Sequence, residues 1–363
     1  MSTTHKSVDS DEEITPPSSV TTTLTPPPSD EKKFLQVQCV ISLFKRIYDG
    51  HYELGPWTEF QLAQGDFDEI QRRLRKDEDL AAFVEHKRRY DYFHGSQCLV
   101  IRMPSTLHEH FSRRVERALI EQIDSIGKGD GEAASFARKV EAGGCERLFF
   151  PDGSIHEPDA SYGHEDTDYP GVIIEVSYSQ KRKALSRLAY DYIIGSKTGI
   201  RVVIGLDIEY GPKRSPQATL SMWRHRRHQT ADGAEHRVDQ TIVDQLFRDA
   251  QGNPAPNPGL TLRLSDFACK KLSEKLLPNE DPEITISCSQ LCECLAVAER
   301  KVQKRQKNLL WNPDDFPAGE RIPARSETPP EELTRDDEAK VVALEEREEQ
   351  ARDEKDPDYE SGR

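Results

Sequence analysis

Two acidic side chains lie in segments that the sequence predicts to be neighbouring strands. Asp159 follows Pro158, and Glu175 directly follows three β-branched residues at 172–174. A carboxylate in such a position is costly to bury without a partner. Two converging carboxylates usually share a hard divalent cation such as magnesium, which prefers oxygen ligands. The pair therefore predicts a Mg²⁺ site with Asp159 and Glu175 as its ligands.

The alternation of side chains along a strand extends this candidate site by one residue. It places Glu175 and Ser177 on one face and Val176 on the other. We expect Asp159, Glu175 and Ser177 to line one site at the end of a sheet. The alternative is that each acid is an ordinary strand-end carboxylate in a structural ion pair, an arrangement that is common.

The pattern around the two acids resembles the PD-(D/E)XK nuclease superfamily, whose members have the restriction-endonuclease-like fold. Pro158-Asp159 precedes one predicted strand, and Glu175-Val176-Ser177 ends the next. A predicted helix at 180–195 and a strand that begins at Gly199-Ile200 follow. The similarity covers roughly residues 90–225 and is closest to a divergent branch of mostly uncharacterised proteins.

This resemblance implies magnesium-dependent hydrolysis of phosphodiester bonds in nucleic acid, either DNA or RNA. Asp159 and Glu175 would hold the Mg²⁺ ion, which polarises the phosphate and helps to deprotonate the attacking water. A glutamate on the helix before the strands often completes such sites. Glu109 and Glu116 are candidates, because two helical turns separate them and they share a face. Glu109 is preferred, since it lies nearer the start of the helix.

The sequence departs from the family at its lysine position, two residues after the second acid, where Ser177 stands. Some members carry the lysine on the following helix, and Lys183 is the expected substitute, stabilising developing charge. Lys181, Gln180 and Arg187 lie nearby, but an arginine cannot serve as a base. If none of them reaches the acids, the alternative is a catalytically inactive domain that binds nucleic acid or protein. A protein-interaction scaffold without affinity for nucleic acid is a third hypothesis.

The order of predicted elements indicates the α/β class. Strands are expected at 96–104, 170–179 and 199–210, and the last two have the continuous apolar runs typical of strands covered on both faces. The alternating segment 217–228 is expected to be an outer strand. Residues 56–93 are expected to be helical in character, with a switch of pattern near the end. With the resemblance, the predicted fold is a restriction-endonuclease-like central mixed β-sheet flanked by helices, with disordered termini.

The clearest predicted helix is the one that carries Glu109 and Glu116. Ser105 and Thr106 can cap its start, and Gly127 is expected to end it. Its apolar side chains repeat at helical spacing: Leu107, Phe111, Val115, Leu119 and Ile123.

Composition and charge divide the chain into four parts. Hydrophobic residues make up 35% of the 363 residues and the net charge is -15. Residues 1–33, rich in Ser, Thr and Pro, are predicted to be disordered, and 34–278 form the restriction-endonuclease-like domain. A helical extension at 279–311 and an acidic tail at 312–363, disordered or forming a solvated helix, follow. Residues 34–278 carry a net charge of only -2, which does not argue against an anionic substrate.

Nucleic acid is the expected partner, and protein contacts are expected through the acidic tail. The basic residues at 224–228 either follow a phosphate backbone or form a solvated edge of a strand. The sequence has no run of about 18 apolar residues that would span a membrane, and its start lacks the apolar part of a signal peptide. Seven scattered cysteines indicate a reducing compartment. We therefore expect no membrane contact and an intracellular location, nuclear or cytoplasmic.

Overall fold

The computed structural model describes residues 34–307 apart from 52–54, 56, 178–181, 209–214 and 231–232. For 182–184 it describes the backbone but not the side chains. The chain divides into two units, Met1–Leu309 and Leu310–Arg363, and every described residue belongs to the first. The predictions of a disordered segment at 1–33 and an acidic tail at 312–363 lie outside the described residues.

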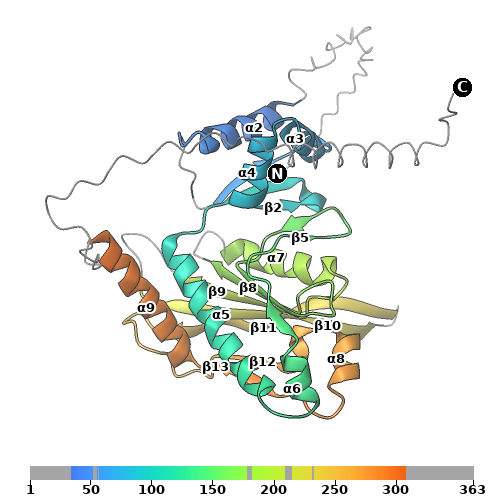
Figure 1. The fold of residues 1–363 in the computed structure, drawn as a ribbon, viewed down its shortest axis with the longest axis vertical. Coiled ribbons are helices and arrows are strands. Elements are labelled where there is room, and N and C mark those ends of the chain that lie inside the picture. The colour runs from blue at the N-terminus through green and yellow to red at the C-terminus, as the bar shows by residue number, and fades with distance from the viewer. Residues whose placement is uncertain are drawn as a thin grey trace, which may run out of the picture. The chain divides into compact units, whose positions relative to one another are not determined.

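A mixed sheet of six strands, in the order β11-β10-β9-β8-β7-β4, forms the centre of the first unit (Figure 1). β8 and β9 are parallel, and the other neighbouring strands are antiparallel. The predicted α/β class with a mixed sheet is thus confirmed. In sheet order the strands are β11 (Gly233–Arg248), β10 (Ala218–Thr230), β9 (Val202–Ile208), β8 (Val172–Ser177), β7 (Ala160–His164) and β4 (Val140–Ala142).

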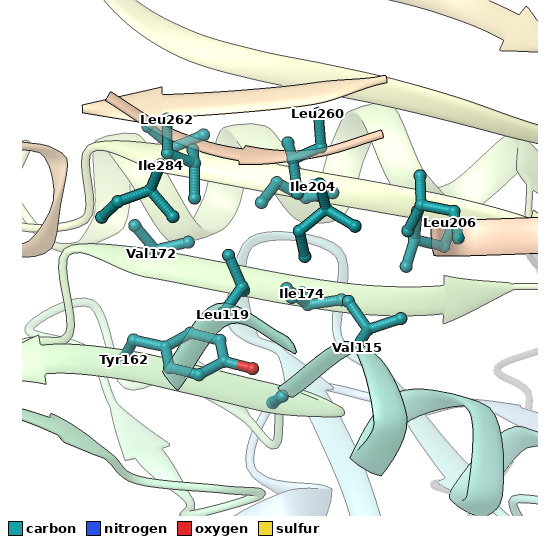
Figure 2. Packing of buried hydrophobic residues seen from close by; sticks show 14 of the residues in the cluster. Val115, Leu119, Tyr162, Val172, Ile174, Ile204, Leu206, Leu260, Leu262 and Ile284 are labelled. Carbon is teal, nitrogen blue, oxygen red and sulfur yellow. The ribbon is translucent and has the colours of Figure 1, made fainter. Parts of the chain in front are cut away.

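Helices cover both faces of this sheet because successive side chains on its strands point in opposite directions. On β8, Ile174 packs in the cluster that contains α5 (Thr106–Gly127), whereas Ile173 packs in the cluster that contains α7 (Arg182–Gly195). Figure 2 shows the first of these layers, with Val115 and Leu119 of α5 beside Ile174. The continuous apolar run therefore reflects burial on both sides, as predicted.

Helix α5 forms where the apolar periodicity predicted it. Its five expected apolar residues are all buried. The Ser105 Oγ atom accepts a hydrogen bond from the backbone N–H of His108 at 3.3 Å, and Gly127 is the last helical residue. This cap provides a partner for one of the free backbone N–H groups in the first turn of the helix.

The C-terminal elements close the α5 side of the sheet. β12 (Leu260–Arg263) pairs with β13 (Glu283–Ile286), and α9 (Cys288–Gln306) packs beside α5 (Figure 1). Helix α9 corresponds to the helix expected within 279–311. Figure 2 shows Leu260, Leu262 and Ile284 on the same apolar layer as Ile204 of β9. Three short helices complete this part: α6 (Glu132–Ala137), η2 (Leu264–Phe267) and α8 (Lys270–Leu276).

A second sheet is built mainly from the chain before α5. Its strands, in order, are β1 (Trp57–Gln61), β3 (Cys98–Arg102), β2 (Arg89–Phe93), β6 (Ile155–His156) and β5 (Leu148–Phe149). One face packs on three helices, α2 (Leu35–Tyr48), α3 (Asp66–Leu74) and α4 (Glu78–Lys87), and η1 (His94–Ser96) joins β2 to β3. Val100, on the other face of β3, joins the cluster of α7. Arg102 shares that face with Val100 by strand alternation.

Two predictions about single elements need correction. Residues 56–93 contain the expected helices, α3 and α4, and end in strand β2 where a switch was expected, but they begin with strand β1, which was not predicted. β10 is not an outer strand, because β11 pairs along its outer edge. β11 carries mostly exposed and half-buried side chains, so it lacks the apolar pattern that would predict a strand.

Candidate functional site

The structure brings Asp159 and Glu175 together. Asp159 directly precedes β7, and Glu175 lies within β8, its antiparallel neighbour. Ala160 pairs with Ile174, so the residues beside this pair, Asp159 and Glu175, are close in the ladder. Their side chains are 2% and 0% exposed. The sequence-based prediction that two buried acids meet at the end of the sheet therefore agrees with the geometry.

The cation between the two acids is the guanidinium group of Arg102. Its Nη1 atom lies 3.1 Å from Glu175 Oε2 and 3.6 Å from Asp159 Oδ1. Its Nε atom lies 2.9 Å from Oδ2 of a third buried acid, Asp91. One arginine thus contacts three carboxylates from three different strand regions.

This arginine is held in its charged form by its neighbours. Burial opposes a positive charge and by itself lowers the pKa of an arginine. The carboxylates of Asp91, Glu175 and Asp159 outweigh burial and raise the pKa of Arg102 well above its usual value. The cluster is therefore a buried ion network, and its stability depends on each charge having its partner.

Three of the charged side chains at the site come from the second sheet. Arg89 and Asp91 alternate with Tyr90 and Tyr92 along β2 and so leave the opposite face of that strand. Arg102 ends β3, where it pairs with Arg89 in the ladder. The site therefore forms where the second sheet meets the edge of the central one.

Other protein groups bind the remaining oxygen atoms of the two acids. The backbone N–H of Val176 donates to Asp159 Oδ2 at 2.8 Å, and Arg89 Nη1 donates to Asp159 Oδ1 at 3.2 Å. His108 Nε2 lies 3.1 Å from the same Oδ1 atom. Tyr192 donates its hydroxyl to Glu175 Oε1 at 2.8 Å. Each of the four carboxylate oxygens thus has a contact with a protein donor.

The tyrosine hydroxyl at this site stays protonated. Burial and the nearby Glu175 carboxylate raise the pKa of Tyr192 well above its usual value. A neutral hydroxyl can donate a hydrogen bond, whereas a phenolate would repel the carboxylate. Tyr192 therefore fixes one oxygen of Glu175 while Arg102 fixes the other.

The donor set as arranged does not fit a magnesium ion. Mg²⁺ needs octahedral oxygen ligands with free lone pairs directed at it. The oxygens of Asp159 and Glu175 are instead directed at Arg102, Arg89, Val176 and Tyr192. Within the described part of the chain, no group of three His, Cys, Asp or Glu side chains could hold a metal ion.

A pocket of about 470 Å³ opens beside Asp159. Glu109 and Glu116 both line it, in agreement with the prediction that they share a face of the helix. Glu109 is bound by Arg89, whose Nη2 lies 3.0 Å from Oε1. Glu175 does not line the pocket and is fully buried, so a ligand in the pocket would meet Asp159 but not Glu175.

Only part of the region around the family's lysine position is described. Ser177 is buried and donates a hydrogen bond to Asp207 Oδ1 at 3.1 Å. Lys183 lies in the first turn of α7, but its side chain is outside the described residues, as are Gln180 and Lys181. Arg187 contacts Ser96 and lies over the ring of Phe93 at 4.9 Å, so it binds the second sheet.

Sequence reasoning missed the cationic side of the site. Arg102 ends the apolar run 99–101, which is the same signal that identified Glu175 after 172–174. A charged residue that continues a buried strand needs a partner of opposite charge. Arg89, Asp91 and His108 gave no comparable signal, because each stands among polar or aromatic neighbours.

No protein-family model matches this chain, and no curated protein matches it. Among the described helices none combines the length and the apolar character that crossing a membrane requires.

Proposed function

We propose that this chain carries a restriction-endonuclease-like domain that binds the phosphodiester backbone of nucleic acid without cutting it by a metal-dependent reaction. The order of elements supports the fold in this proposal. Helix α5 is followed by β7 after Pro158-Asp159, by β8 with Glu175, by α7, and by β9 after Gly199-Ile200. This order is the one that the resemblance implies.

One observation carries the choice of a binding function over a catalytic one. The Nη1 atom of Arg102 contacts both Asp159 and Glu175, the two acids that would otherwise share a metal ion. Removing a buried arginine from such a network leaves uncompensated charge, which costs about 3–5 kcal/mol. Arg102 therefore partly offsets the charges of the two acids without a divalent cation, and Arg89 adds a second positive charge beside Asp159.

Basic side chains at the pocket support a polyanionic ligand. Arg113 and Arg117 line the pocket with side chains 78% and 80% exposed, and each has an acid on its own helix, Glu109 at 4.0 Å from Arg113 and Glu121 at 2.6 Å from Arg117. The basic run at 224–228 contributes less than the sequence suggested. Within it, Arg224 binds Asp266 at 2.6 Å and Arg226 binds Asp239 at 3.2 Å. Pairing partly neutralises these arginines as it does Arg117, but the Arg224 side chain is only 29% exposed, so this run is a weaker candidate for contacts with phosphate.

Magnesium-dependent hydrolysis of nucleic acid is the second candidate function. The pocket favours it, because Glu109 and Glu116 meet Asp159 there, as the resemblance implies for the helix glutamate. In this hypothesis Asp159 and Glu175 hold Mg²⁺ and Lys183 takes the part of the displaced lysine. It requires Arg102 to leave both carboxylates.

Binding and cleavage assays on the same samples separate the two functions. Single- and double-stranded DNA and RNA are incubated with the full chain and Mg²⁺, and both complex formation and product are measured. We expect binding without product, unchanged in Asp159→Asn and Glu175→Gln variants that remain folded. Cleavage that is lost in both variants would instead establish the nuclease. Absence of binding at low salt would overturn both candidates and favour a protein-interaction scaffold.

A further inference from the structure

Five exposed basic side chains gather where the first half of α5 packs beside the last half of α9. We call Arg113, Arg114, Lys301, Lys304 and Arg305 the α5–α9 basic surface. Burial, and then the positive charges of Lys301, Arg305, Arg113 and Arg114, lower the pKa of His110, which lies among them. Side chains from two distant parts of the sequence thus form one positive region.

Most of these charges lack a counter-ion. Among the described residues, Arg114, Lys301, Lys304 and Arg305 make no ion pair. Four of the six acids on the two helices have other partners: Glu109 binds Arg89, Glu121 binds Arg117, Glu293 binds Arg300, and Glu299 binds Arg248. Like charges held close together repel one another, and a bound polyanion relieves that repulsion.

The α5–α9 basic surface borders the pocket at Asp159. Arg113 belongs to this surface and also lines the pocket, together with Glu109, Glu116 and Asp159. A polyanion bound along the two helices would therefore pass the mouth of the pocket. Lys304 and Arg305 lie three and four residues after Lys301, so all three project from one side of α9.

The character of this surface favours a nucleic acid over a membrane or an apolar peptide. The exposed large hydrophobic residues of the described chain are Leu35, Tyr48, Phe149, Tyr190 and Val243, and none lies on α5 or α9. Binding of an amphipathic helix to a membrane needs apolar side chains beside the basic ones. Sequence-independent binding of nucleic acid needs only lysines and arginines that replace counterions on the phosphates.

We infer that the α5–α9 basic surface binds the phosphodiester backbone of nucleic acid and leads it past the pocket at Asp159. The inference rests on the proposed function and names the surface through which that function operates. The competing occupant is the chain's own residues 312–363, which carry 18 acidic and 8 basic side chains.

The test measures binding of a fluorescein-labelled DNA duplex, and of its single strand, by fluorescence anisotropy over a range of salt concentrations. The variant is Lys301→Ala/Lys304→Ala/Arg305→Ala in the full chain. We expect at least a ten-fold loss of affinity at low salt. The slope of log K against log salt should fall by about 2–3, because each lost phosphate contact contributes about 0.7–0.9.

A matched control removes the same number of exposed charges from another helix. Lys270→Ala/Lys271→Ala/Lys275→Ala on α8 changes the net charge equally, and these three lysines are also exposed. We expect this variant to bind nearly as tightly as the unmodified chain. Circular dichroism and thermal melting verify that both variants are folded.

The outcomes distinguish failure of this inference from failure of the proposed function. If the unmodified chain binds and both triple variants weaken binding equally, or neither does, the α5–α9 basic surface is not the binding site. If the unmodified chain binds no nucleic acid, the proposed function itself fails. Carbodiimide crosslinking tests the competing occupant. If Lys301 or Lys304 crosslinks to residues 312–363 and the crosslinks persist in excess nucleic acid, the surface binds the acidic segment and the inference is overturned.

Discussion

Arg102 and Glu175 form an ion pair that is almost fully removed from solvent. The Nη1 and Oε2 atoms are 3.1 Å apart, and the two side chains are 4% and 0% exposed. Taking both charges out of water is costly, and their attraction repays that cost only when further hydrogen bonds satisfy the remaining atoms. Asp91 and Asp159 add ion-pair contacts to Arg102, and the Tyr192 hydroxyl donates a hydrogen bond to Glu175. The site is therefore a network whose members depend on one another.

Replacing Arg102 with methionine should destabilise the protein strongly. Arg102→Met leaves Asp91, Asp159 and Glu175 buried without their shared cation, and we expect the free energy of unfolding to fall by about 3–5 kcal/mol. Chemical denaturation measures this change. The loss should be smaller in Arg102→Lys, which keeps the charge, and unfolding curves of Arg102→Met that overlay those of the unmodified chain would contradict the network.

The same variant should gain affinity for a divalent cation. Asp91, Asp159 and Glu175, having lost the cation that they share, supply oxygen ligands suitable for Mn²⁺ or Mg²⁺. We expect Mn²⁺ to raise the melting temperature of Arg102→Met and to leave that of the unmodified chain unchanged. Adding Glu175→Gln to Arg102→Met should remove most of the effect. Equal shifts in all three proteins would indicate non-specific binding elsewhere.

Two buried tyrosines offer a matched test of the hydrogen bond to Glu175. The Tyr192 hydroxyl donates to Glu175 Oε1, whereas the Tyr162 hydroxyl is buried without a hydrogen-bond partner. Tyr192→Phe should reduce the free energy of unfolding by about 1–3 kcal/mol, because a buried carboxylate oxygen loses its donor. Tyr162→Phe should be neutral or slightly stabilising. The same loss in both variants would show that the hydroxyl of Tyr192 has no special role.

His110 reports on the charge of the α5–α9 basic surface. Burial and the surrounding lysines and arginines hold its pKa below the ordinary value of 6.5. The unfolded chain therefore takes up the proton first, so the contribution of His110 to stability falls as the pH decreases below 6.5. NMR titration should find a pKa below 6.5 that rises when nucleic acid binds. A pKa that the ligand does not change would place the ligand elsewhere.

The sequence was sufficient for the elements whose pattern is local. The apolar repeat of α5 and its Ser105 cap predicted that helix to within a residue. The apolar run before Glu175 predicted β8, and strands close in sequence usually pair, which brought Asp159 to its side. Local pattern therefore predicted half of the site.

The other half depends on contacts between distant segments. Arg102 and Glu175 are 73 positions apart, and only the packing of the second sheet against the central one joins them. A local sequence pattern does not predict which acid a buried arginine will contact. β11 was missed for a related reason, because it forms on the edge of β10 with few buried side chains of its own.

The central claim is that Arg102 takes the position of the metal ion between Asp159 and Glu175. Electron paramagnetic resonance of Mn²⁺ tests it directly, because bound Mn²⁺ loses the sharp signal of the free ion. With the unmodified chain we expect the free-ion signal to persist at an equal concentration of protein. Stoichiometric loss of that signal, restored by both Asp159→Asn and Glu175→Gln, would contradict the account and return the site to a metal-dependent nuclease.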